Sequence, residues 1–135
     1  RNTFVVLVNR EDRLLFNGEI GEINMLKDRA KEFLSNPQNL DNLPEKMTKD
    51  IPLLGTVEVS KGVISLQNDR GTSYEMYLMV QNELTAAVNE LRDEMARVKF
   101  GKAYIDCSDA QREAIDKAIP IAISEAEPKN IGGKK

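Results

Sequence analysis

The sequence predicts an α+β fold of two layers, in which helices cover one face of a single mixed β-sheet. β-Branched and aromatic runs at residues 3–8, 63–67 and 121–126 are typical of strands. Apolar residues recur at helical spacing over residues 23–34 and 74–98. One sheet covered by helices on one face is the natural arrangement for this order of elements.

The first elements are predicted to be a β-hairpin and a short helix. TFVVLV is the first strand, NREDR is a charged turn, and LLF runs into Asn17-Gly18, a turn signal. We therefore expect a hairpin over residues 3–20, with the Asn-Gly step leading out of its second strand. The helix over residues 23–34 should end at Asn36-Pro37, because the residue before a proline avoids the α region.

Residues 36–50 are polar and interrupted by prolines, which predicts a long surface loop. The alternating valines of residues 55–60 predict a short edge strand. Gly62 then permits a turn into the strand at residues 63–67.

The longest periodic segment, residues 74–98, predicts an amphipathic helix. Tyr77, Leu84, Leu91 and Val98 repeat every seven residues. The stripe favours a helix lying on a sheet, with a coiled-coil seam as the alternative. The helix should close at Gly101, a suitable residue for a left-handed C-cap.

A second, shorter helix is predicted after Ser108, because Ser108 and Gln111 match a capping box. It should stop at Pro120, and the last strand follows at residues 121–126. One domain is expected over residues 1–128, and the tail, residues 129–135, is expected to be disordered.

The turn NDRGTS lies between a strand and a helix, where many α/β proteins bind a phosphate. A phosphate-binding loop would need several glycines or a lysine, whereas this turn has only Gly71. We interpret it as a structural corner. Thr72 and Glu75 are predicted to form a capping box at the start of the long helix.

Few residues suggest catalysis. The chain has no histidine and one cysteine, Cys107, expected to be a buried apolar residue. No carboxylate pair lies in an apolar context that would raise its pKa for acid–base work. We expect no catalytic residue, cofactor or metal, and so no enzyme. The competing enzyme hypothesis would use Asp69, Asp106 or Cys107.

Charge and hydropathy limit the possible partners. The net charge is −3 with both signs interspersed, so no nucleic-acid partner is expected. No apolar stretch approaches the ~20 residues that span a bilayer. The chain begins without methionine, so we expect a fragment whose preceding segment could include a membrane anchor.

Two strands are candidates for pairing with another chain by β-augmentation. The first carries Val5, Val6 and Leu7, and the second carries Ile121, Ala122 and Ile123. The alternative, that both are internal strands of the sheet, stands beside this hypothesis.

The chain resembles the periplasmic domain of the ExbD/TolR family of biopolymer transport proteins, especially ExbD proteins of the Bacteroidetes type. The resemblance rests on VVLVNREDRLLFNGEI, VISLQNDRGTSYEMYLMVQNEL and the closing ISEAEPKNIGGKK. The family's marker positions fall on Asn17, Gly18, Asp69, Tyr74 and Leu84. The loop 36–60 and the stretch 100–120 depart from the family pattern.

The resemblance implies a single-pass inner-membrane protein with a periplasmic domain. It implies a homodimer inside an ExbB-like ring, which uses the proton-motive force to drive a TonB-like protein and outer-membrane import. The family's proton-linked carboxylate lies in the membrane helix, so no residue here is given that role. A TolR-like subunit that binds peptidoglycan during envelope constriction is the alternative.

Overall fold

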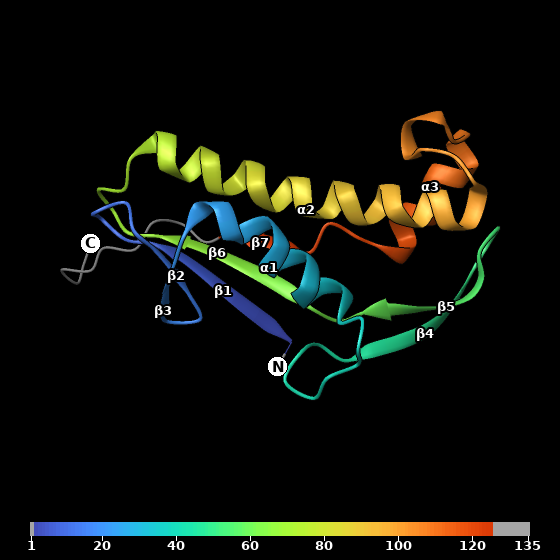
Figure 1. Ribbon diagram of the computed structural model, residues 1–135, viewed down its shortest axis with the longest axis horizontal. Helices are drawn as coiled ribbons and strands as arrows, with labels where there is room; N and C mark the ends of the chain where they lie inside the picture. Colours follow the sequence, from blue (N-terminus) through green and yellow to red (C-terminus); the bar gives the residue numbers. More distant parts are fainter. Residues whose placement is uncertain (1, 126–135) are drawn as a thin grey trace.

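The computed structural model describes residues 2–125 of the chain. A five-stranded sheet of order β3-β2-β1-β6-β7 carries helices α1 and α2 on one face (Figure 1), so the predicted α+β class is confirmed. A second, two-stranded sheet, β4-β5, and the helix α3 lie near the carboxyl end of α2 (Figure 1). The elements are β1 (Thr3–Val8), β2 (Leu14–Phe16), β3 (Glu19–Gly21), α1 (Ile23–Ser35), β4 (Lys46–Ile51), β5 (Gly55–Ser60), β6 (Val63–Asn68), α2 (Tyr74–Phe100), the 3₁₀ turn η1 (Tyr104–Asp106), α3 (Asp109–Ala118) and β7 (Ile123–Glu125).

The sheet is mixed because its centre is parallel and one side is antiparallel. Strand β1 pairs antiparallel with β2 and parallel with β6, in a register from Thr3↔Val63 to Val8↔Asn68. Strand β7 adds parallel to β6, opposite Ile64, Ser65 and Leu66. Each parallel neighbour therefore arrives through a crossover that contains a helix, as parallel pairing requires.

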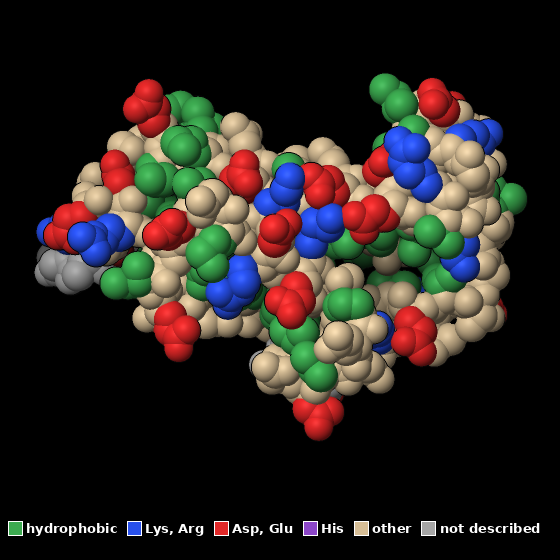
Figure 2. Space-filling view, in the orientation of Figure 1, with side chains coloured by type: hydrophobic (Ala, Val, Ile, Leu, Met, Phe, Trp, Pro, Cys, Tyr) green, Lys and Arg blue, Asp and Glu red, His purple; other side chains and the backbone are tan. Residues whose placement is uncertain are grey.

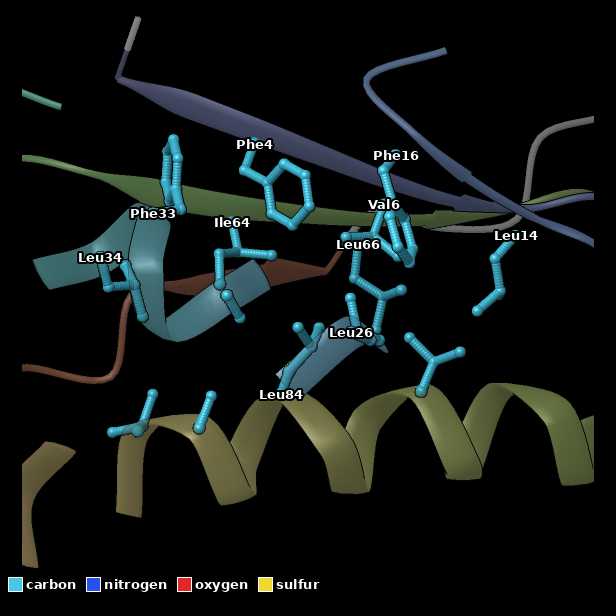
Figure 3. Packing of buried hydrophobic residues seen from close by; sticks show 14 of the residues in the cluster. Phe4, Val6, Leu14, Phe16, Leu26, Phe33, Leu34, Ile64, Leu66 and Leu84 are labelled. Carbon is cyan, nitrogen blue, oxygen red and sulfur yellow. The ribbon is translucent and has the colours of Figure 1, made fainter. Parts of the chain in front are cut away.

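The core lies between the sheet and the two helices. Alternate residues of β1 and β6 point to the helices, and Figure 3 shows Phe4, Val6, Ile64 and Leu66 facing Leu84 of α2. These five side chains are at most 1% exposed. Burying one such side chain contributes about 1.5–3 kcal/mol to the free energy of folding.

The Asn17-Gly18 step leads out of β2, the second strand of the first hairpin, as predicted. It joins β2 to β3 as a second tight hairpin, and this third strand was not predicted. Both residues have positive φ, 52° and 90°, which is the backbone that a two-residue hairpin turn of this hand requires. The three-residue β3 was missed because EIG is too short to show a strand pattern.

The prediction of a loop over residues 36–50 is wrong for its second half. Residues 46–51 form β4, which pairs with β5 from Lys46↔Ser60 to Ile51↔Gly55. In KMTKDI only Ile51 is buried, so the strand has no apolar alternation to reveal it. The predicted strand at 55–60 is confirmed, but its partner is β4 and it stays outside the main sheet.

The predicted Thr72–Glu75 capping box is also wrong. Ser73 is the N-cap, and its hydroxyl accepts from the Met76 amide at 3.1 Å. The Thr72 hydroxyl instead donates to the carbonyls of Val8 and Asn9, at 3.1 and 3.2 Å, because the end of β1 lies beside this turn.

The other helix ends follow the sequence. Gly101 is the left-handed C-cap of α2, with φ of 71°, and Ser108 and Gln111 form the predicted capping box at α3. Helix α2 packs on the sheet, and Val98 of the heptad stripe is 81% exposed. Within residues 2–125, no helix combines the length and apolar character needed to cross a membrane. The predicted disordered tail, residues 129–135, lies outside the described residues.

Candidate interaction edges

Strand β1 is not an exposed edge, which corrects one of the two strand-pairing candidates. It is the middle strand of the sheet, with β2 on one side and β6 on the other. The backbone N–H of Val5 donates to Asn17 Oδ1, and the Val5 carbonyl accepts from the Asn17 N–H, both at 2.8 Å. Val6 is fully buried, and Leu7 pairs with Leu15 and Gln67. Nearly continuous apolar residues such as TFVVLV are typical of a central strand.

Strand β7 is the edge of the main sheet at the opposite end from β3. In the part of the chain that the structure describes, β6 is its only pairing partner. The Ile64 N–H donates to the Ala122 carbonyl at 2.7 Å. Since successive residues of a strand turn their backbone groups to opposite sides, the N–H and C=O of Ile123 point away from β6. Ile121 stands beside this edge and is 67% exposed.

Two side chains of α2 fasten β7 in place. The Tyr77 hydroxyl donates to Glu125 Oε1 at 2.7 Å, and the Gln81 amide donates to Glu125 Oε2. These donors lower the pKa of Glu125, with Gln81 as the larger cause. Burial, and then the bond to Glu125, raises the pKa of Tyr77 to about 12. The edge is therefore preformed, and a partner strand would meet it without first ordering it.

The markers Asn17 and Gly18 form the β2–β3 turn, and the Asn17 side chain ties this turn to β1. Strand β3 is the other edge of the sheet. Its central residue, Ile20, is 71% exposed. Gly21 is pressed against the Phe16 ring, where a Cβ atom would lie 2.3 Å from Cε2. These markers therefore have a structural role here.

Asp69 and Tyr74 flank the corner between β6 and α2. The Asp69 N–H donates to the Val8 carbonyl at 2.9 Å, and the residue is 9% exposed. Asp12, from the β1–β2 turn, accepts from the Ser73 N–H at 3.0 Å. The β1–β2 turn and the β6–α2 corner are therefore hydrogen-bonded to each other. They lie at the carboxyl ends of the parallel strands, where open α/β sheets often bind ligands. Tyr74 points outward and is 74% exposed.

The groups of the competing enzyme hypothesis do not come together in a cluster with metal-binding composition. Among the described residues, no group of three or more acidic or cysteine side chains is placed to hold a metal ion. Cys107 is 4% exposed, and its Sγ lies 3.4 Å from the Ala103 carbonyl. It packs in a small cluster with Ala96 and Ile115, as a small apolar residue would.

An exposed apolar surface near β3 was missed from sequence. Ile20, Ile23, Met76 and Met79 line two shallow depressions that meet at Ile23. Figure 2 shows apolar side chains gathered over this end of α1 and α2, with acidic groups between them. Helical periodicity shows which residues share the apolar face of a helix. It could not show that these residues are exposed, because it does not say where the sheet beneath the helix ends.

The sequence matches no protein-family model and no curated protein.

Proposed function

We propose that this chain is the periplasmic domain of an ExbD-like inner-membrane subunit that couples the proton-motive force to TonB-dependent outer-membrane transport. In this proposal the domain forms a homodimer and passes motion to a TonB-like partner by strand pairing. An ExbB-like ring would surround its membrane anchor. The residue pattern around Asn17, Asp69 and Tyr74 supports the assignment, and the mixed α+β fold is compatible with it.

The observation that carries the proposal is the exposed edge of β7. Ile123 turns an N–H and a C=O outward, and a strand that pairs there gains two backbone hydrogen bonds. Ile121 offers an exposed apolar side chain beside them. The bonds from Tyr77 and Gln81 to Glu125 hold the strand on α2, so pulling by a partner would be transmitted to the long helix. Main-chain pairing of this kind gives affinity, and neighbouring side chains give specificity.

The test is a titration of the ¹⁵N-labelled domain with a synthetic peptide from the periplasmic part of a TonB-like protein. We expect saturable amide shifts in residues 121–125 and in β6. The variant Ile121→Asp should weaken binding at least tenfold. Ile105→Asp is the matched control, because Ile105 is 79% exposed in η1, outside the sheet edge. Absence of shifts in every strand, or equal losses in both variants, would contradict the proposal.

A TolR-like role predicts a different result. A domain that binds peptidoglycan should be retained on purified sacculi, and the TonB-like peptide should leave its spectrum unchanged. Retention without peptide binding would therefore replace the proposal with the TolR-like alternative.

A further inference from the structure

A hollow lies between the β4–β5 hairpin and the helices. Its volume is about 180 Å³, and its walls include Leu34 at the end of α1, Leu91 and Met95 of α2, and Ile119 after α3. Figure 2 shows it opening below the carboxyl half of α2, with apolar side chains at its rim. An apolar cavity of ~150 Å³ is enough to hold a benzene-sized molecule. This hollow can therefore take one aromatic ring or a branched aliphatic chain.

The hollow exists because two separate clusters of buried residues meet there without filling the space. The hairpin packs on α3 through a cluster that includes Val57 and Ala114, while the main core lies between the sheet and α1 and α2. Ile119 packs against both clusters. The Arg92 side chain fixes that wall, donating from Nε to the Ile119 carbonyl at 2.8 Å. This wall is therefore held by a hydrogen bond within the chain that does not depend on an occupant.

Two opposite charges stand at the mouth of the hollow. Lys46 lies opposite Ser60 in the hairpin, and Glu58 is two residues before Ser60, so all three share one face. Within residues 2–125, none of the ion pairs involves Lys46 or Glu58, whereas nearby Lys61 pairs with Glu45 at 3.5 Å. Lys46 is half-buried and lines the hollow, and Glu58 is exposed at the same rim. The mouth thus presents one cation and one anion that are not joined to each other.

We propose that this hollow binds a free apolar α-amino acid of about the size of phenylalanine. The side chain would lie between Leu91, Met95 and Ile119. The ligand's carboxylate would pair with Lys46 and its ammonium with Glu58. A zwitterion satisfies both charges at once, which neither an apolar acid nor an apolar amine does. This site is separate from the β7 edge and does not rest on the proposed transport role.

The experiment is an NMR titration of the whole chain with L-phenylalanine, phenethylamine and hydrocinnamate. The last two probes carry the same ring but lack the carboxylate or the ammonium, respectively. We expect saturable shifts at the amides of Ser60, Gly62 and Ala122, and binding of phenylalanine at least fivefold tighter than that of either probe. Lack of saturable shifts, or equal affinity for all three compounds, would overturn the proposal.

Variants separate a direct contact from a structural effect. Lys46→Met should weaken phenylalanine about tenfold and leave phenethylamine unchanged, because that probe has no carboxylate to lose. Glu58→Gln should weaken phenylalanine and phenethylamine but not hydrocinnamate. Lys49→Met is the matched control, since Lys49 is exposed on the same strand and does not line the hollow. If Lys49→Met weakens phenylalanine as much as Lys46→Met, or if Lys46→Met weakens phenethylamine equally, the assignment is wrong.

Discussion

Replacing Asn36 by alanine should remove a large part of the stability of this fold. Asn36 is fully buried just after α1, with φ of 41°. Its Nδ2 donates to the carbonyls of Leu40 and Pro44, at 3.1 and 3.0 Å, and its Oδ1 accepts from the Leu40 N–H at 2.8 Å. One side chain therefore closes the loop that leads from α1 to β4.

The expected cost follows from these contacts. Each hydrogen bond contributes about 1 kcal/mol to the free energy of unfolding. Alanine in the left-handed region costs roughly 1 kcal/mol more. Asn36→Ala should therefore lose about 4 kcal/mol. Asn36→Gly loses the same bonds without the backbone strain, so it should lose about 3 kcal/mol.

Urea unfolding followed by circular dichroism at 222 nm measures both variants. With an m value of about 1.5 kcal/mol/M, the alanine variant should unfold at a midpoint roughly 2.5 M below the wild type. If the alanine variant does not fold, the loss of stability is measured on the glycine variant alone. A loss below ~1 kcal/mol for both variants, or a glycine variant less stable than the alanine variant, would refute the reasoning.

Three further changes test other parts of the fold by the same unfolding assay. Ser73→Ala removes the true N-cap of α2 and should cost about 1 kcal/mol, whereas an unchanged midpoint would contradict this assignment. Tyr77→Phe should cost about 1 kcal/mol at pH 7. Because the folded pKa of Glu125 is lowered, that deficit should shrink as the pH falls through the lowered value, and a deficit that grows in acid would argue against the bond. Gly62→Ala places a Cβ atom 2.7 Å from Pro44 Cγ and should cost about 1–3 kcal/mol, whereas an unchanged midpoint would mean that Pro44 moves freely.

The sequence predicted those elements whose own residues carry the signal. Helix α2 and strands β1 and β6 have apolar patterns set by the core, and Gly101 and Ser108 mark helix ends by local chemistry. Strand β4 could not be found this way, because only one of its six residues, Ile51, is buried. Its pairing with β5 depends on backbone groups, which are the same for every residue type.

The choice between Thr72 and Ser73 as N-cap shows a second limit. Both hydroxyls can cap a helix, and the sequence Thr-Ser-Tyr-Glu favours Thr72. In the structure the Thr72 hydroxyl donates to the Val8 carbonyl at the end of β1, a residue far away in the sequence. The same reasoning applies to the β7 edge, since only the strand order reveals that β1 is enclosed and β7 is not.

The parallel pairing of β1 with β6 has a consequence for synthesis of the chain. Strands β1, β2 and β3 are local and can form as soon as they leave the ribosome, but residues 3–8 pair in the finished sheet with residues 63–68. Until those residues are made, one side of β1 is a bare, apolar edge of the kind that recruits foreign strands. The closing strand β7 comes near the end of the described chain. The nascent protein therefore passes through a long interval in which one side of β1 is uncovered, and faster translation of residues 9–68 should shorten that interval.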